Sequence, residues 1–374
     1  MSIPQLDLQA QYRAIKPELD EAVSRVLASG HFIMGPEVQA FEQEVAQHCA
    51  VKHAIGVASG TDALLLSLRA LGVGPGDAVL IPSFTFFATA GTVCNVGATP
   101  VFVDIDPATY NMDPADVKKR LNGKLPGQPK AIIPVHLYGQ MAEMEALQRI
   151  AQKHGLFVIE DAAQAIGATS KGKQAGTLGH TGCFSFFPSK NLGACGDGGM
   201  VITSDDALAE KIRILRVHGS KPKYYHKVVG YNSRLDALQA AILRVKLKHL
   251  NAWSKARQEK ADRYNALLKG VSGVQTPCVT QGNSHIYHQY TIRVGAEKRD
   301  ALAAHLKEGG IDTAVYYPLG LHLQECFQNL GYGKGDLPHT EAASEDVLSL
   351  PIYPELDEQQ IKMVVASIAE FMTS

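Results

Sequence analysis

The chain has 374 residues, 45% hydrophobic and 20% charged, so it can bury a large core and exceeds the size at which one core usually stops growing. Its 36 basic and 37 acidic residues nearly cancel, which argues against nucleic acid or an anionic membrane as partner. The N-terminus shows no signal-like or spanning apolar run, so we expect a cytoplasmic protein with no membrane segment. Six cysteines without CxxC spacing indicate reduced thiols and no metal site.

Short apolar runs recur through the first part of the chain, with helix-forming segments between them. Runs that are apolar on both faces are typical of buried strands in a mainly parallel sheet covered by helices. We therefore expect an α/β fold with seven strands at residues 53–59, 78–83, 99–105, 131–137, 156–161, 183–187 and 199–203. Helices are expected between them at residues 62–71, 141–154 and 206–217.

Residues 235–264 contain no Gly or Pro and predict one long helix that leads out of the large domain. Beyond it the pattern changes to a helix near 298–308, an extended segment at 313–318 and a C-terminal helix from about residue 357. This mixture predicts a smaller α+β domain. We place the boundary near residue 250, giving a large domain at 1–250 and a small domain at 251–374, packed together.

The strand at 156–161 ends in Glu160 and Asp161. A carboxylate at this edge lies where open α/β sheets bind ligands, although Asp161 taken alone is better explained as a cap of the next helix. Between an earlier strand and helix, Gly60 and Thr61 offer backbone N–H groups and a hydroxyl to a phosphate at a positive helix terminus. A plain capping turn explains them as well.

Lys190 stands between an aromatic strand and a glycine-rich tail, FSFFPSKNLGACGDGG. A partly buried lysine has a lowered pKa and can form a Schiff base with an aldehyde or ketone, whereas most lysines are simply exposed loop residues. Ser185 adds a hydroxyl nearby. An anion anchor, a partner for a ring nitrogen and an amine that binds an aldehyde are the three requirements of pyridoxal phosphate.

The combined motifs resemble the DegT/DnrJ/EryC1/StrS family of sugar aminotransferases, within the fold-type I pyridoxal-phosphate enzymes. The resemblance covers nearly the whole chain. It is carried by GPEVQAFE (35–42), SGTDAL (59–64), GVGPGD (72–77), PSFTFFAT (82–89), PVFVDIDPATYNMDP (100–114), PVHLYGQ (134–140), IEDAAQAIGA (159–168), SFFPSKNLGACGDGG (185–199) and GYNSRLDALQAAIL (230–243).

The resemblance implies that Lys190 binds the cofactor aldehyde and later moves the proton, and that Asp161 pairs with the pyridinium nitrogen. It also implies that Gln164 contacts the ring hydroxyl and that Phe86 stacks on the ring, although Phe86 could instead be ordinary core. Relatives that carry histidine in place of the lysine perform dehydration. Lys190 therefore indicates transamination.

For the phosphate, the resemblance implies Gly60, Thr61 and Ser185. It also implies Asn232 from the neighbouring subunit, and hence a homodimer with shared active sites. Without the resemblance, Asn232 is only a candidate helix cap.

The expected substrates are L-glutamate and a nucleotide-linked keto-sugar, and the chain is most similar to the subgroup acting on UDP-2-acetamido-2-deoxy-3-oxo-glucuronate. A uronic acid brings a carboxylate, for which arginine is suited, so Arg234 is the candidate partner, with Tyr316 and Tyr317 closing over the sugar. That subgroup has histidine at the position of Tyr316. Arg234 could instead pair locally with Asp236.

Three other functions stay open. A 4-keto-6-deoxyhexose aminotransferase on a dTDP- or UDP-sugar would need no Arg234. A non-catalytic regulator with this fold would need a DNA-binding segment or loss of the lysine, and neither is seen. Sulfur transfer would need a reactive thiol, but Cys195 in its glycine-rich turn is expected to pack, and His322 is left without a role.

Overall fold

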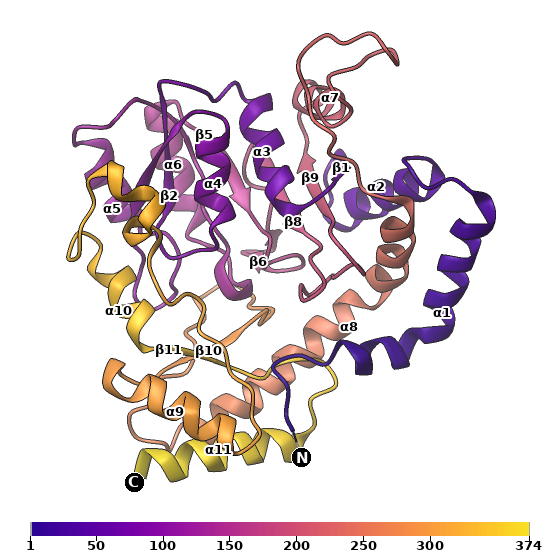
Figure 1. The fold of residues 1–374 in the computed structure, drawn as a ribbon. Helices are drawn as coiled ribbons and strands as arrows, with labels where there is room; N and C mark the ends of the chain where they lie inside the picture. Colours follow the sequence, from indigo (N-terminus) through magenta and orange to yellow (C-terminus); the bar gives the residue numbers. More distant parts are fainter. Residues whose placement is uncertain (1, 374) are drawn as a thin grey trace.

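The computed structural model describes residues 2–373. Its centre is a sheet of seven strands in the order β1-β9-β8-β5-β4-β2-β3 (Figure 1). The strands are β1 (His53–Val57), β2 (Asp77–Pro82), β3 (Thr99–Val103), β4 (Gln128–Ile132), β5 (Phe157–Asp161), β8 (Thr181–Ser185) and β9 (Gly199–Thr203). Within this sheet β9 is antiparallel to both neighbours and the other pairs are parallel, so the predicted mainly parallel sheet is confirmed.

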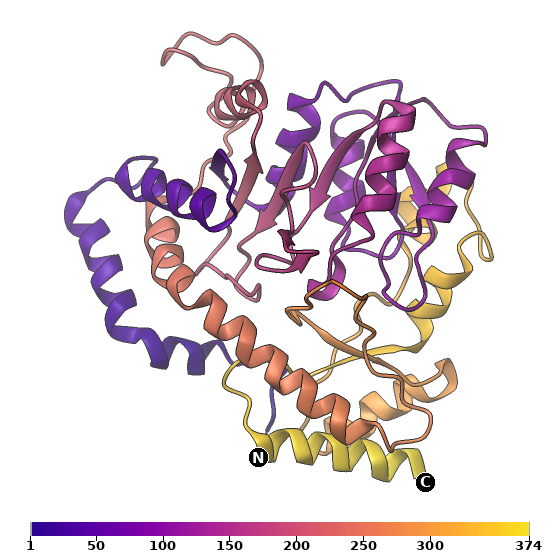
Figure 2. The same ribbon diagram turned by 180° about the vertical axis from the view of Figure 1, so that it is seen from behind.

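Helices cover both faces of the sheet (Figures 1 and 2). Alternate residues of each strand enter opposite cores, as Leu80 and Ile81 of β2 show. One core also contains side chains of α3 (Gly60–Ala70), α4 (Ala88–Asn95) and α7 (Asp206–Leu215). The other contains side chains of α1 (Leu8–Ser29), α2 (Pro36–His48), α5 (Pro114–Leu121), α6 (Met144–His154) and α8 (Ala237–Leu268).

The long helix α8 crosses the molecule diagonally, with α1 lying along its outer side (Figure 2). It runs without a break through residue 250, so the domain boundary placed there stays a prediction. No helix in the described part of the chain has the length and apolar character needed to cross a membrane.

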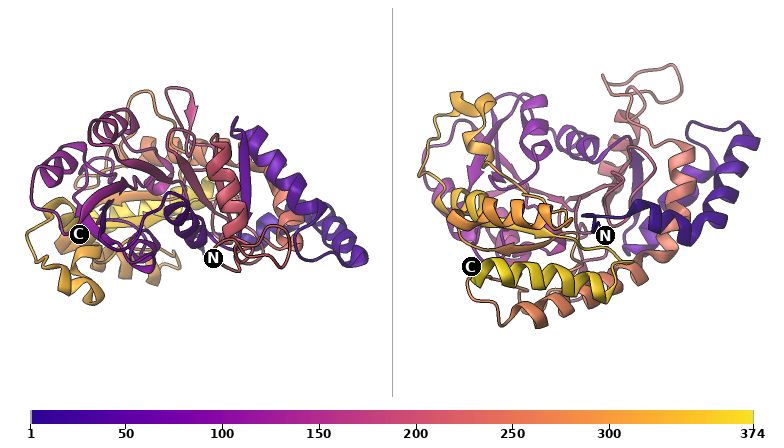
Figure 3. Two further views of the ribbon diagram at one scale, coloured as in Figure 1. Left: turned by 90° about the horizontal axis from the view of Figure 1, so that it is seen from above. Right: turned by 60° about the horizontal axis from the view of Figure 1, so that its bottom comes forward.

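The C-terminal part forms its own layer below the sheet (Figure 3). The strands β10 (Tyr290–Arg293) and β11 (Val347–Leu350) pair antiparallel and share a core with α9 (Ala296–Glu308) and α11 (Glu358–Thr373). The two predicted helices in this region are therefore confirmed. The expected extended segment at 313–318 forms no strand, because only Ala314 pairs there, in an isolated bridge to Ser349.

Residues 320–346 return from this layer to the large sheet. Leu321 and Phe327 enter the core beside α3 and α4, the latter from the short helix η3 (Glu325–Leu330). At the start of α10 (Pro338–Asp346), the buried carboxylate of Asp104, just after β3, accepts hydrogen bonds from the backbone N–H of His339 and Thr340 and from the Thr340 hydroxyl. A carboxylate from another element thus caps α10.

Replacing Asp104 by Ala should lower the free energy of unfolding by about 2 to 4 kcal/mol, because it leaves buried donors at Thr340 without an acceptor. Urea unfolding followed by fluorescence measures the loss. Asp300→Ala, at a side chain that is 86% exposed, is the control and should change stability by less than about 1 kcal/mol. Equal effects of the two substitutions would contradict the capping role of Asp104.

Candidate active site

The strand β5 ends in two buried carboxylates that face opposite sides of the sheet. Glu160 accepts a hydrogen bond from His136 Nε2 at 2.7 Å and further bonds from backbone N–H groups within residues 176–179. His136 is completely buried, and its Nδ1 accepts the N–H of Ala142. Glu160 is therefore fully used in holding the fold.

Asp161, on the other face, has fewer partners. Its Oδ2 accepts the hydroxyl of Thr89, on α4, at 2.8 Å, and its Oδ1 accepts the N–H of Ala163 at 3.2 Å. Burial raises the pKa of Asp161, while these two bonds and the nearby charge of Lys190 act to lower it. A cationic N–H placed against this carboxylate would restore its charged form.

Lys190 lies in the turn that follows β8, closed by its N–H bond to the Phe187 carbonyl at 2.8 Å. Among the described residues, no hydrogen bond or ion pair holds its Nζ. Desolvation lowers the pKa of Lys190 to about 8, and the charge of Asp161 partly opposes that shift. A neutral amine at such a pKa is a usable nucleophile and proton carrier near neutral pH.

Gln164 is held from both ends. Its Oε1 accepts the N–H of Tyr138 at 2.7 Å, and its Nε2 donates to the Tyr317 hydroxyl at 3.2 Å. The ring of Tyr317 lies 6.5 Å from that of Phe86, between centroids, and Phe86 is 59% exposed. Phe86 is thus not part of the core and presents its ring to open space.

The start of α3 approaches β8 closely at Gly60. A Cβ on Gly60 would lie 2.6 Å from Cβ of Ser185, so only glycine fits at this point. Ser59 caps the helix by accepting the N–H of Asp62, and Thr61 is exposed. The hydroxyl of Ser185 and the free N–H groups of the first helical turn therefore lie side by side, as an anion site requires.

The remaining predicted site residues, Tyr316, Asn232 and Arg234, have fewer hydrogen bonds to the rest of the site. Tyr316 accepts the Tyr138 hydroxyl at its carbonyl oxygen, which links it to Gln164. Asn232 is exposed and Arg234 is half-buried just before α8. Among the described residues, no hydrogen bond or ion pair joins either of them to Lys190 or Asp161. The structure also shows no ion pair between Arg234 and a described acid, so the local pair with Asp236 is absent.

Sequence reasoning missed Thr89 and Tyr138, which orient Asp161 and Gln164. The run expected as a strand at 131–137 belongs to β4 only to Ile132, continues with an isolated bridge from Val135 to Asp161, and then turns through Tyr138, whose φ of 57° no sequence pattern had indicated. One expectation needs correction, because Cys195 is exposed and not packed as expected. His322, for which no role was expected, is buried, with its ring nitrogens bonded to Ser83 and Glu341.

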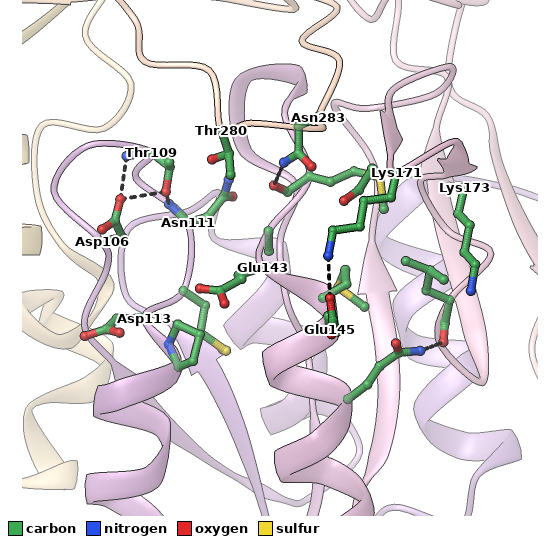
Figure 4. Close-up of a pocket in the computed structure, with 18 of the residues that line it drawn as sticks. Asp106, Thr109, Asn111, Asp113, Glu143, Glu145, Lys171, Lys173, Thr280 and Asn283 are labelled. Atoms are coloured by element: carbon green, nitrogen blue, oxygen red, sulfur yellow. Dashed lines mark hydrogen bonds and ion pairs between the residues drawn. The ribbon is translucent and has the colours of Figure 1, made fainter.

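A cavity of about 560 Å³ opens elsewhere, between α5, α6, residues 170–173 and residues 280–283 (Figure 4). Its rim carries the ion pair of Lys171 with Glu145, and Asn283 donates to the carbonyl of Met141 across its wall. None of the predicted site residues lines it. The chemistry of Lys190 and Asp161 therefore does not take place in this cavity.

The residues around Lys190 fit pyridoxal phosphate. The unbonded Nζ of Lys190 suits an aldehyde and the buried Asp161 suits a pyridinium N–H. Gln164 offers an amide, Phe86 an exposed aromatic face, and the Gly60–Ser185 approach an anion site. These groups supply each type of contact that the cofactor requires.

Curated relatives match along nearly the full length of the chain. A "Pleiotropic regulatory protein" of Geobacillus stearothermophilus is 56% identical, with 99% of each chain covered. A UDP-N-acetyl-3-dehydro-alpha-D-glucosamine 3-aminotransferase of Acidithiobacillus ferrooxidans is 48% identical, covering 98% of this chain and 97% of the relative. A UDP-2-acetamido-2-deoxy-3-oxo-D-glucuronate aminotransferase of Pseudomonas aeruginosa is 46% identical, covering 97% and 98%.

Among solved structures, DesV of S. venezuelae, crystallised with a ketimine intermediate, superposes with a TM-score of 0.96 at 44% identity. The superposition covers 100% of this chain and 99% of DesV. The predicted fold class is therefore confirmed.

Labelling of the cofactor-free protein by acetic anhydride should show Lys190 reacting with an apparent pKa of about 8, because burial disfavours its ammonium form. Asp161→Asn should move this value lower, because the carboxylate charge raises the pKa of Lys190. Peptide mass spectrometry against pH measures both, with exposed lysines of the same sample as internal reference. An apparent pKa near 10.4, ordinary for lysine, would contradict the described surroundings.

Gly60→Ala should weaken retention of pyridoxal phosphate by about tenfold or more, about 1.4 kcal/mol, because the new methyl group pushes α3 from Ser185. Absorbance of the protein after dialysis measures the bound cofactor. Gly270→Ala is the matched control, since nothing lies within 4 Å of a Cβ there. If both variants keep the cofactor equally, the close approach of Gly60 to Ser185 has no role in binding it.

The model of the DegT/DnrJ/EryC1/StrS aminotransferase family matches residues 13–369, which is nearly the whole chain. Together with the full-length relatives and the bound intermediate of DesV, this match confirms the enzyme class and the cofactor predicted from the sequence. The chain belongs to the DegT/DnrJ/EryC1/StrS family of sugar aminotransferases, and its cofactor is pyridoxal 5'-phosphate.

Proposed function

We propose that this aminotransferase moves the amino group of L-glutamate to a 3-keto sugar carried on UDP, and that the acceptor is UDP-2-acetamido-2-deoxy-3-oxo-glucuronate. The observation that carries the proposal is the similarity over the full length to two enzymes whose names place the reacting carbon at C3 of a UDP-linked 2-acetamido sugar. A 4-keto-6-deoxyhexose acceptor, the other candidate, has no such support in these two names.

Lys190 is the acid and base of the proposed reaction. When bound, the cofactor supplies an aldehyde and an electron-withdrawing ring. Lys190 Nζ, with a pKa lowered to about 8, can hold a proton taken from the donor carbon and return it to the sugar carbon. No described side chain holds this Nζ by a hydrogen bond or ion pair, so it is free to move between the two positions.

Asp161 supplies the fixed charge. The Thr89 hydroxyl and the Ala163 N–H orient its two oxygens, so the carboxylate cannot turn away from a ring nitrogen placed against it. Gln164, fixed by Tyr138 and Tyr317, presents its amide to the ring hydroxyl. These groups are already oriented before the cofactor binds. Such preorganisation lowers the free energy needed to stabilise the charge that develops in the reaction.

The sugar carboxylate is assigned to Arg234. Its guanidinium is half-buried and unpaired with any described acid, so its bidentate donors are available to a ligand. Tyr317 accepts a hydrogen bond from Gln164 and its ring neighbours that of Phe86, and Tyr316 precedes it, which supports a role for both beside the cofactor ring. We assign both tyrosines to the sugar.

A homodimer with shared active sites is part of the proposal. Residues 218–230, between α7 and α8, project from the body of the protein (Figure 1). They expose Tyr224 by 79% and Val229 by 87%, which is costly for an isolated chain. In the proposed dimer, a second copy that covers this loop would receive Asn232 and Arg234 near its own Lys190.

The setting of the reaction is proposed from the same similarity. A UDP-sugar and L-glutamate are metabolites of the cytoplasm, where we place the enzyme. The amino sugar would enter a surface polysaccharide such as lipopolysaccharide.

A regulatory role is the second candidate, because the Geobacillus relative carries the name of a regulatory protein. The intact arrangement of Lys190 with Asp161 favours catalysis, since a regulator has no need of a lysine amine with a lowered pKa. The absorbance change on adding L-glutamate separates the two: a regulator gives none, and Lys190→Ala gives none in either case.

Arg234→Ala should lower kcat/KM for the 3-oxo-glucuronate by about 10- to 100-fold, because it removes a charge-assisted bidentate contact. The kcat/KM for UDP-N-acetyl-3-dehydroglucosamine should change by less than about threefold. The two acceptors differ only in the carboxylate, so the difference reports on it. Arg69→Ala, at an exposed arginine, is the control. The uronate assignment is wrong if both acceptors respond alike, or if wild type uses only the neutral sugar.

A further inference from the structure

Residues 285–289, here called the strap, connect two turns of the active site. The strap lies between α8 and β10 in sequence and reaches the Tyr138 turn through backbone hydrogen bonds. The N–H of Ile286 donates to the carbonyl of Gly139 at 3.0 Å, and the N–H of Gln289 donates to the carbonyl of Tyr138 at 3.2 Å. The strap therefore supports the turn whose Tyr138 N–H holds Gln164.

The same strap holds the turn of Lys190 through the next residue, Asn191, which is only 6% exposed. Asn191 Nδ2 donates to the carbonyl of Ile286 at 3.3 Å, and Asn191 Oδ1 faces Nδ1 of His288 at 3.0 Å. The first bond fixes the orientation of the amide, because a carbonyl oxygen can only accept. His288 Nδ1 must therefore carry a hydrogen and donate it to Asn191.

The surroundings of His288 keep it in that neutral form. Burial lowers the pKa of His288 well below its usual value, and the charges of Lys190 and Arg257 lower it further. One tautomer, with hydrogen on Nδ1, then persists over the working pH range.

The strap is itself fixed from behind by α8. Arg257 Nη1 donates to the carbonyls of Tyr287 at 3.1 Å and Ile352 at 2.7 Å, and Gln258 Nε2 donates to the carbonyl of His285 at 3.0 Å. Gly139 permits the close approach on the other side, since a Cβ there would lie 2.8 Å from Ile286. The strap is thus a rigid support and not a mobile loop.

We propose that His288 is a positioning residue: the bond from its Nδ1 to Asn191 holds the Lys190 turn at the distance from Asp161 and Gln164 that the cofactor requires. Among the described residues no hydrogen bond or ion pair holds Lys190 Nζ, so the placement of this amine depends on the backbone on either side of it. The inference rests on the role given to Lys190 and not on the identity of the sugar.

Two matched substitutions test it. His288→Asn keeps a side-chain N–H at the place of Nδ1, whereas His288→Gln places its amide at the position of Nε2 and cannot reach Asn191 in the same way. Both are neutral and polar, so a general loss of packing affects them similarly.

The enzyme loaded with pyridoxal phosphate is treated with borohydride, whose hydride reduces the carbon–nitrogen double bond between the cofactor and Lys190 Nζ. Mass spectrometry of the peptide then gives the rate of trapping.

The rate of trapping in His288→Asn should lie within about twofold of the wild-type rate. In His288→Gln it should be about tenfold lower, because small misplacements of a reacting group are costly. The melting temperatures of the two variants should be similar. The rate of the absorbance change with L-glutamate should follow the same order, in kcat more than in KM. Equal trapping in wild type and both variants would overturn the proposal, and so would an equal loss in both variants. If wild type itself is not trapped at Lys190, the role of Lys190 fails and the inference with it.

Discussion

The C-terminal end of β5 carries two buried carboxylates in sequence, and a carboxylate without water must find donors or lose its charge. Because side chains alternate along a strand, Glu160 and Asp161 face opposite sides of the sheet. Glu160 receives His136 and three backbone N–H groups and becomes part of the fold. Among the described residues, only Thr89 and Ala163 donate hydrogen bonds to the carboxylate of Asp161, which leaves it able to pair with a cationic ligand.

The rest of the site is arranged around this incompletely paired carboxylate. Burial raises the pKa of Asp161 and lowers that of Lys190, so burial disfavours the charged form of each group. No ion pair joins the two within the described chain. Each group is therefore available to a ligand, and a cofactor with both a basic nitrogen and an aldehyde can partner the two.

The supports of the site come from parts of the chain that are distant in sequence. Thr89 lies on α4, Gln164 follows β5, Lys190 follows β8 and the strap follows α8. Tyr138 and Gln164 hold the segment of Tyr316 and Tyr317. Buried His322, later in the same segment, bonds Ser83 just after β2 and Glu341 in α10. The C-terminal layer therefore does not simply lie below the sheet; through 285–289 and 316–322 it completes the site.

The sequence by itself determined the strands, the main helices and the chemical identity of the site. Continuous apolar runs can only be buried strands or helices, and Lys190 and Asp161 occur in motifs distinctive enough to indicate pyridoxal phosphate. Tertiary structure alone decided what holds them. The bond from Thr89 to Asp161, the left-handed Tyr138, and the bond from His288 to Asn191 depend on which distant segments meet after folding. Such contacts leave no local periodicity or spacing, because a single hydrogen bond between remote residues constrains one side chain at each end and nothing along the chain between them.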